Sequence, residues 1–266
     1  VALNNGKMIL FFINDDGERE GYDRTALYYS VYDGYWNPPV LLQDDGTADY
    51  DPYVKEIGGR LLVLWSSSNT QFGDVRPPMS DLLNSTDIYS QWFDLDGAKS
   101  GEIMRITFDD GAYGNMSPEA VYDRETETVM LLYQKTDYKT EGVSFDDNVL
   151  SIGDYLNNSY NTIAYRLYVN GEWITSYEAG ETSYINYEQI NGSGSLYGQR
   201  FLDLSIGKID PTVSEIAATT QQGMACIAYT VDLDNNPYTK DDTELFMLTY
   251  NFAEKSFTSP AGITNN

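Results

Sequence analysis

Histidine is absent from this chain and cysteine occurs once, and these two shortages restrict the chemistry that its residues can support. Without histidine, the 266 residues cannot form a Ser-His-Asp or Cys-His relay or a His-ligated zinc site. Cys226 lies inside an apolar run, so we expect a small buried side chain and a fold that does not depend on disulfides. Glycoside hydrolysis remains open, because it needs only two suitably separated carboxylates.

Positive charge and long apolar segments are also scarce. The chain carries 16 lysines and arginines against 41 aspartates and glutamates, a formal net charge of −25. Such a charge repels nucleic acid and anionic membrane surfaces, and it favours cations or neutral partners that bind through hydrogen bonds. No apolar run reaches about 18 residues. We therefore expect no nucleic-acid partner and no insertion into a membrane.

Sustained helical periodicity is missing as well, and short apolar runs recur in a fixed order instead. Each copy has a valine, usually in a Pro-x-Val segment, then a glycine turn and an apolar run that ends in an aromatic residue. A threonine then opens another apolar stretch, and three of these stretches end in Asp-Gly or Asn-Gly. The aromatic ends of the four runs are Phe12, Trp65, Tyr133 and Tyr229. Repetition at this period is typical of repeat architectures.

Each copy is predicted to form four antiparallel strands. Runs rich in branched and aromatic residues favour strands, and Asp-Gly or Asn-Gly supplies the positive φ angles of a two-residue hairpin. A repeated four-stranded meander is typical of a β-propeller blade. We therefore predict an all-β, β-propeller-like array of about four four-stranded antiparallel blades in one domain, residues 1–266, with repeats at approximately 1–51, 52–116, 117–209 and 210–266. A plain β-sandwich is the alternative.

Both ends of the chain fall inside the repeat pattern. Val1 occupies the position of Val54, partway along an expected first strand, and the last repeat stops where a further strand is expected. Two interpretations stay open. Either the chain is a fragment of a longer protein with further repeats or domains, part of a larger propeller, or the ring closes by pairing strands from its two ends.

The long connections of the expected blades all fall on one face. In an up-and-down meander, the loops after the second strand and the connections between blades share one end of the sheet, and here they include residues 66–85, 134–161 and 175–208. Loops placed by a rigid scaffold commonly carry binding and catalysis. Aromatic rings stack on sugars and peptides. We therefore expect ligand contacts from loop tyrosines, namely Tyr138, Tyr155, Tyr160, Tyr184 and Tyr187.

Ordered acids in two of these loops predict a site for a hard cation. Asp232, Asp234 and Asn236 alternate and Asp241 follows, a pattern whose oxygens converge on calcium when a loop curls. The first repeat offers a similar set, which is Asn14, Asp16, Glu18 and Asp23. A solvated acidic turn is the alternative in both loops. We expect no organic cofactor.

Three carboxylates at the entries to inner strands are the candidates for catalysis. Asp51 and Asp210 each precede a proline that opens an expected strand, and Glu119 follows Pro118. Two such groups would suffice for glycoside hydrolysis. Because the Asp-Pro pairs belong to the repeat itself, a structural role as turn residues is the alternative.

The repeats resemble the blades of sialidase-like propellers of the Asp-box or BNR type, through the segment SVYDGYW at 30–36 and, more faintly, NGEW at 170–173. The resemblance implies a bacterial protein that is secreted or displayed on the cell surface. It does not extend to the Arg-Ile-Pro motif, and the chain has few arginines to hold an anionic sugar. Sialidase activity itself is therefore not expected.

Three functions compete on these observations. We predict non-catalytic recognition of a glycan or protein ligand through the long acidic, tyrosine-rich loops on one propeller face. A glycoside hydrolase-like propeller with paired carboxylates is the second, and a structural spacer of a surface protein is the third. A concave pocket with two carboxylates roughly 5 to 10 Å apart would indicate the hydrolase.

Overall fold

The computed structural model describes residues 1–108, 111, 113–138, 159–174, 212–232, 243–258 and 260–264. The chain divides into two compact units, unit 1 (Val1–Pro118) and unit 2 (Glu119–Asn266). The described residues form strands, two short 3-10 turns, η1 (Asn4–Gly6) and η2 (Gly21–Asp23), and the short helix α1 (Met79–Asn84). No helix among them is long and apolar enough to cross a membrane.

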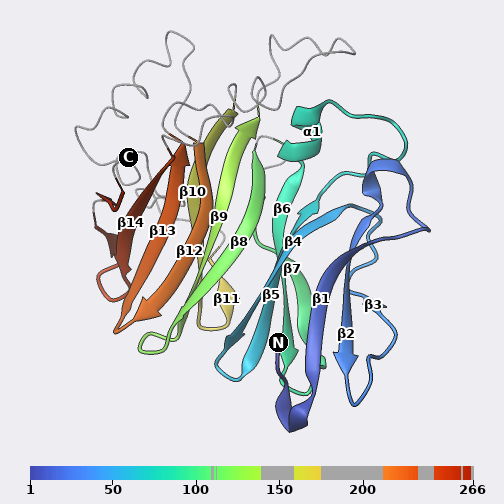
Figure 1. Cartoon of the computed structure of the whole chain (residues 1–266), viewed down its shortest axis with the longest axis horizontal. Helices are drawn as coiled ribbons and strands as arrows, with labels where there is room; N and C mark the ends of the chain where they lie inside the picture. The colour runs from blue at the N-terminus through green and yellow to red at the C-terminus, as the bar shows by residue number, and fades with distance from the viewer. Residues whose placement is uncertain are drawn as a thin grey trace. The chain divides into compact units, whose positions relative to one another are not determined.

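Unit 1 holds two antiparallel sheets (Figure 1). The first has the order β1-β2-β3, from β1 (Met8–Asp15), β2 (Thr25–Tyr32) and β3 (Val40–Leu41). The second has the order β4-β5-β6-β7, from β4 (Asp49–Ile57), β5 (Arg60–Ser68), β6 (Thr86–Asp94) and β7 (Lys99–Arg105). Each strand pairs antiparallel with the next one along the chain, so both sheets are meanders.

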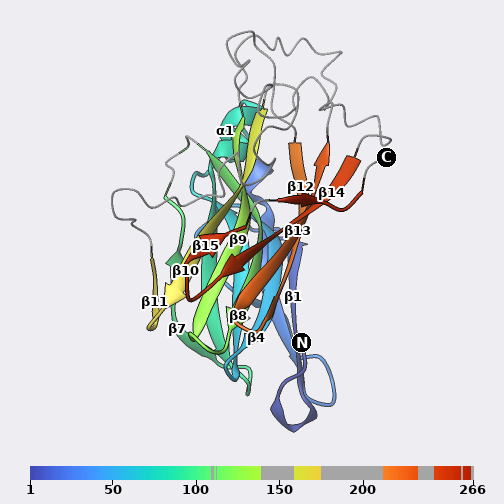
Figure 2. The same cartoon turned by 90° about the vertical axis from the view of Figure 1, so that its left-hand side faces the viewer.

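The third and fourth sheets follow in the chain, with their strands again in meander order (Figure 2). The third has the order β11-β10-β9-β8, from β8 (Gly114–Asp123), β9 (Thr128–Tyr138), β10 (Ser159–Val169) and β11 (Glu172–Trp173). The fourth has the order β12-β13-β14-β15, from β12 (Thr212–Gln221), β13 (Met224–Asp232), β14 (Thr243–Asn251) and β15 (Ser256–Phe257). Its fifth strand, β16 (Ala261–Gly262), also pairs with β14.

Tight turns close one end of the sheets, as the sequence predicts. Asn170 and Gly171 join β10 to β11 with φ of 54° and 90°, the pair of positive values that a two-residue hairpin of this composition needs. Gly58 and Gly59 do the same between β4 and β5, with φ of 57° and 80°. The connection from β5 to β6 at the other end is much longer and carries α1.

Each unit has its own apolar core between two sheets. In unit 1, Phe11 of β1 packs with Trp65 of β5 and Phe93 of β6, and the rings of Phe11 and Phe93 meet edge to face with centroids 5.1 Å apart. In unit 2, Leu132 of β9 packs with Tyr229 of β13, and both are fully buried. Burying one such side chain stabilises the fold by about 1.5 to 3 kcal/mol.

The fold class is therefore the predicted one, an all-β, β-propeller-like array of antiparallel meander sheets. The strand number varies around the expected four, because the first sheet has three strands and the fourth has five. The expectation of a buried Cys226 is wrong, since this side chain in β13 is partly exposed.

Candidate functional site

Buried polar side chains gather at one end of unit 1. We call this end the loop end; it is formed by the β1–β2 loop (16–24), the connection that precedes β4 (42–48) and the β5–β6 loop (69–85). The apolar run of β5 gives way there to serines 66–68, all of them buried. Because a buried polar group costs free energy unless it is hydrogen-bonded, the partners of these side chains determine how the loops are held.

Asp23 ties the β1–β2 loop to the β5–β6 loop. Its carboxylate group is buried, with the residue 4% exposed, and it accepts hydrogen bonds from the backbone N–H groups of Phe72, at 2.9 and 3.1 Å, and Gly73, at 2.7 Å. The N–H of Tyr22 in turn donates to the carbonyl oxygen of Gly73 at 3.0 Å. Hydrogen bonds to a buried charge are worth about 1.5 to 3 kcal/mol each. We call this arrangement the Asp23 clamp.

Gly21 makes this close approach possible. Its φ is 53°, and a Cβ atom at this position would lie 1.9 Å from the carbonyl oxygen of Gly73. Any other residue would have to push the two loops apart, because real Cβ atoms do not come this near to a backbone oxygen. The glycine is therefore required by the contact between the loops as well as by its own backbone angle.

Arg19 connects the same β1–β2 loop to the residues before β4. The side chain is 8% exposed, and its guanidinium group donates to the carbonyl oxygens of Thr47 and, at 3.1 Å, Gln43. It also lies 3.7 Å from the carboxylate of Asp16 and 3.8 Å from that of Asp45. A guanidinium group offers five donors in a fixed plane, so one side chain holds several segments of the loop end together.

Asp49 is a buried acid at the start of β4. It is 0% exposed, and its Oδ2 accepts a hydrogen bond from the N–H of Leu27 at 3.0 Å. Burial raises the pKa of Asp49 to about 6, while the hydrogen bonds from Leu27 and the Ser67 hydroxyl act in the opposite direction. Its charge therefore changes in a pH range where an ordinary aspartate is already ionised.

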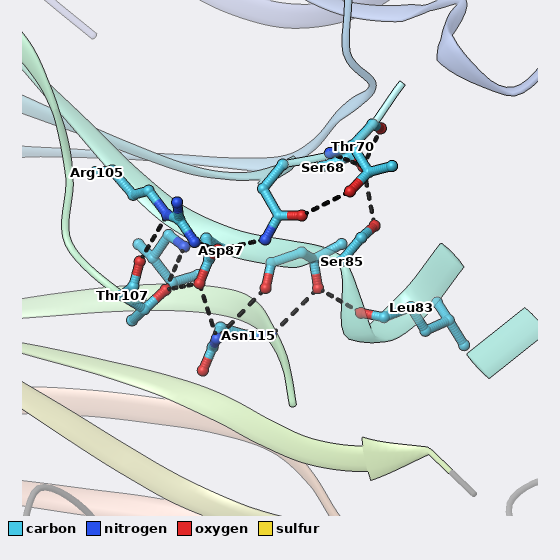
Figure 3. Close-up of polar contacts among 11 residues, drawn as sticks. Ser68, Thr70, Leu83, Ser85, Asp87, Arg105, Thr107 and Asn115 are labelled. Atoms are coloured by element: carbon cyan, nitrogen blue, oxygen red, sulfur yellow. Dashed lines mark hydrogen bonds and ion pairs between the residues drawn. The ribbon is translucent and has the colours of Figure 1, made fainter. Parts of the chain in front are cut away.

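Asp87 organises a second polar cluster, at the start of β6 (Figure 3). Its Oδ1 accepts hydrogen bonds from the Thr107 hydroxyl at 2.6 Å and the Asn115 amide at 3.2 Å. Its Oδ2 accepts from the Arg105 guanidinium group at 2.5 Å and the Asn69 amide at 2.8 Å. Four donors thus surround a carboxylate that is 1% exposed. The cluster joins the β5–β6 loop to β6 and to the segments around β7 and β8.

The buried acids of the loop end thus hold the loops and strands through hydrogen bonds. The surface of the same loops also carries aromatic and apolar side chains. Tyr22, next to the Asp23 clamp, is 37% exposed, and Val75 in the β5–β6 loop is 76% exposed. Phe72, whose N–H is bonded to Asp23, is half-buried. Loops with fixed backbones thus present an aromatic ring and an apolar side chain within an acidic surrounding. Such a surface can stack on a flat ligand and accept hydrogen bonds from its hydroxyl groups.

The carboxylates that the sequence singles out for catalysis lie in different parts of the chain. Asp51 lies in β4 of unit 1, exposed, with a φ of 48°, at a point where the pairing of β4 with β5 is irregular. Glu119 lies in unit 2, where its Oε1 accepts a hydrogen bond from the N–H of Ala218 at 2.9 Å. Asp210 lies outside the described residues. No two of them are described within one unit.

Glu215 takes the place in β12 that the sequence assigns to Asp210. The pairing of β12 with β13 shifts between Ser214 and Ile216, and Glu215 between them is exposed with a φ of 47°, like Asp51. Aligning the prolines misses this equivalence. Counting back from the aromatic ends finds it, because 14 residues separate Glu215 from Tyr229 and Asp51 from Trp65.

Most of the expected ligand-binding tyrosines cannot be placed. Tyr138 ends β9 and pairs with Ser159, and Tyr160 in β10 pairs with Asp137, so the backbones of the two tyrosines lie on adjacent strands near one end of the sheet. Tyr155, Tyr184 and Tyr187 lie outside the described residues. The sequence pattern does not single out Tyr22, although its neighbours Gly21 and Asp23 mark a turn.

The structure describes the first of the two loops with ordered acids and only the start of the second. Asp232 is the last residue of β13, while Asp234, Asn236 and Asp241 lie outside the described residues, so this site stays a prediction. In the first loop, Asp16 accepts a hydrogen bond from the N–H of Glu18 at 3.0 Å, and both oxygens of Asp23 are used in the clamp. Within the described part of the chain, no group of three or more His, Cys, Asp or Glu residues could hold a metal ion.

Comparison with known proteins finds likeness at the level of structure. Neither protein-family models nor the sequences of curated proteins give a match. Among solved structures, the chain is similar to an inulosucrase from Halalkalicoccus jeotgali bound to kestose, with a TM-score of 0.50 and 14% identity over 98% of this chain and 63% of the other.

Two further structures are similar at comparable levels. An α-L-arabinofuranosidase of Fusarium graminearum has a TM-score of 0.47 and 10% identity, over 99% of this chain and 74% of the other. A Hadza microbial sialidase has a TM-score of 0.48 and 11% identity, over 88% of this chain and 44% of the other. The chain thus spans less than two thirds of the inulosucrase and less than half of the sialidase. At these identities the likeness concerns the fold alone.

Proposed function

We propose that this chain is a glycan-binding domain and that the loop end of unit 1 is its ligand surface. The observation that supports this proposal is the Asp23 clamp, which fixes the two loops that carry Tyr22 and Phe72. Loops that are ordered before the ligand arrives lose less conformational entropy on binding. An exposed aromatic ring on such a loop offers a flat face for a sugar ring.

The charge of the chain favours a neutral glycan. A formal net charge of −25 disfavours sialic and uronic acids, whereas carboxylates and loop carbonyl groups accept hydrogen bonds from sugar hydroxyl groups. We further propose that the protein acts outside the cell, secreted or on the cell surface, where glycans of this kind are met. A protein ligand on the same surface is the alternative partner.

The test is binding to an array of neutral oligosaccharides, followed by calorimetric titration of the best ligand. Tyr22→Ala should weaken binding at least about tenfold, a loss typical of one stacking contact, and Tyr22→Phe should keep most of it. Tyr35→Ala is the matched control, because Tyr35 is 69% exposed but lies in the hairpin after β2, at the end opposite the loops. Equal losses for the two alanine variants, or no neutral glycan bound, would refute the proposal.

Glycoside hydrolysis is the second candidate, and the backbone at Asp51 and Glu215 favours it. Both side chains are exposed at irregular points of β4 and β12, with the positive φ that non-glycine residues adopt mainly where function or packing demands it. The bound oligosaccharide should be incubated with the chain and its products separated by chromatography. Cleavage by the parent chain that is lost in Asp51→Asn or in Glu215→Gln, each tested by itself, while binding persists would establish a hydrolase and reject the purely recognitional role.

A further inference from the structure

A second exposed aromatic ring lies at the loop end of unit 1. β7 pairs antiparallel with β6, and β6 begins directly after the β5–β6 loop, so β7 ends at the loop end. Phe108 follows β7 in the chain and is 55% exposed. Single exposed apolar side chains are common on protein surfaces, so exposure alone does not make Phe108 a binding residue. The way in which its ring is held distinguishes it.

The ring of Phe108 rests on a guanidinium group that is itself fixed. Cζ of Arg105 lies over the ring, 4.9 Å from its centroid. Arg105 donates from Nε to the carbonyl oxygen of Thr107 at 3.0 Å and from Nη2 to Oδ2 of Asp87 at 2.5 Å (Figure 3). A cation over one face of an aromatic ring is attracted to it. Arg105 thus holds one face of the ring, and the other face and the edge provide its exposed area.

The charge around this ring favours a neutral ligand. The Arg105 side chain is 26% exposed and is paired with the buried carboxylate of Asp87. An anionic ligand would have to compete with that carboxylate for the guanidinium group. A sugar ring needs only the flat face of Phe108 for stacking, and its hydroxyl groups can bond to polar groups nearby.

Residues 69–73 connect the surroundings of Phe108 with the Asp23 clamp, and we call them the bridge segment. At one end, the Asn69 amide donates to Oδ2 of Asp87 at 2.8 Å. At the other end, two backbone N–H groups donate to the carboxylate of the clamp. In the middle, the Gln71 amide donates to a carbonyl oxygen of the connection that precedes β4, at 3.0 Å. A segment fixed at three points loses little conformational entropy when a ligand binds along it.

The two aromatic rings are therefore tied to opposite ends of one ordered segment. The N–H of Tyr22 donates to the carbonyl oxygen of Gly73 at one end, and Phe108 rests on the Arg105 side chain, which shares Asp87 with Asn69 at the other. A chain as short as that from residue 69 to residue 73 spans at most about 14 Å. A single sugar ring covers one aromatic face, whereas a linear oligosaccharide can follow the bridge segment from one ring to the other.

We propose that Phe108 forms a second sugar subsite at the loop end, and that the ligand is a neutral linear oligosaccharide long enough to contact both Phe108 and Tyr22. This inference rests on the glycan binding proposed above and specifies the size of the ligand. The contact with Phe108 forms within a complex that already exists, so it adds to the affinity that Tyr22 provides. Affinity should therefore rise with ligand length until both rings are covered.

The test is calorimetric titration of the parent chain and its variants with linear oligomers of glucose, xylose, arabinose and fructose, from disaccharides to hexasaccharides. Phe108→Ala should weaken the binding of hexasaccharides at least about tenfold and that of disaccharides by no more than about twofold. The retained binding of disaccharides shows that the variant is folded. Phe108→Trp should keep the affinity for hexasaccharides, because a flat face remains, whereas Phe108→Leu, which is apolar but not flat, should lose it.

Met104→Ala is the matched control. Met104 is 44% exposed and neighbours Arg105 in β7, but successive side chains of a strand point to opposite faces. This variant should therefore bind every oligomer as the parent does.

Three results would overturn the inference. If Phe108→Ala binds hexasaccharides as the parent does while Tyr22→Ala binds them weakly, Phe108 is not part of the ligand surface and the proposed function stands. Equal losses in Phe108→Ala for short and long oligomers would place Phe108 in the same subsite as Tyr22. No binding of any neutral oligomer to the parent chain would refute the proposed function, and the second subsite with it.

Discussion

Asp49 gives the chain a built-in dependence of stability on pH. Burial raises its pKa from 3.8 to about 6, so the folded state holds the proton more tightly than the unfolded state does. The contribution of this group to stability is therefore fully favourable at low pH and is lost as the pH rises from about 4 to about 6. Replacing Asp49 by asparagine removes the titration, while the amide oxygen can still accept the hydrogen bond from Leu27.

The size of the effect follows from the shift. A pKa raised from 3.8 to about 6 means that the ionised side chain costs the fold about 3 kcal/mol relative to the protonated one. At pH 4 little of this cost applies, and at pH 7.5 nearly all of it does. The free energy of unfolding of the Asp49→Asn variant, relative to the parent, should therefore increase by about 2 kcal/mol between these two pH values.

Urea unfolding of parent and variant at pH 4, 5, 6 and 7.5, followed by tryptophan fluorescence, measures this difference. Trp65 is a suitable reporter, because it belongs to the same core as Leu27, whose N–H is bonded to Asp49. All other acids titrate in both proteins, so the difference between the two curves isolates Asp49. A relative stability that does not change with pH, or that falls as the pH rises, would refute the reasoning.

Two further substitutions test how the loop end is held. Gly21→Ala should destabilise unit 1 by at least about 3 kcal/mol, because its Cβ would overlap the carbonyl oxygen of Gly73. Gly34→Ala is the control: nothing lies within 4 Å of its Cβ, so it should cost roughly 1 kcal/mol for its backbone angle alone. Similar urea midpoints for the two variants would contradict the close contact. Asp87→Ala should lower the free energy of unfolding by about 3 to 5 kcal/mol, since it removes the carboxylate that accepts hydrogen bonds from Arg105 and the neighbouring amide groups. A decrease below about 1 kcal/mol in the same assay would show that the cluster does not hold the loop.

The strands could be predicted from the sequence because the signals that form them are local. Asn170-Gly171 specifies a tight hairpin through its own backbone preferences, and β11 follows where the turn places it. The run LLVLW predicts β5 because a strand covered on both faces is apolar at successive positions. In both cases the relevant residues are close together in the chain, so spacing and composition suffice.

The candidate site depends on contacts that spacing does not reveal. The carboxylate of Asp23 meets the N–H of Phe72 across 49 residues of sequence, and only the packing of the first sheet on the second brings the two loops together. The sequence does not distinguish a carboxylate that accepts hydrogen bonds from backbone N–H groups, as Asp23 does, from one that binds calcium, because both are aspartates in a polar loop. The prolines of the repeat do not mark Glu215, because Pro211 lies four residues before it whereas Pro52 directly follows Asp51; the distance to the aromatic end of the next run is the same in both cases.

The unusual backbone at three strand positions bears on which side chains the fold can accept there. These positions are Asp51, Ser117 and Glu215. All three residues adopt a left-handed conformation although none is glycine, with φ of 48°, 47° and 53°. At Asp51 and Glu215 the register of the neighbouring strand, rather than the identity of the side chain, imposes this conformation. A carboxylate can therefore be exchanged for a hydroxyl group, or a short acid for a long one, without rebuilding the sheet. Different chemical groups can thus stand at similar backbone positions in β4, β8 and β12.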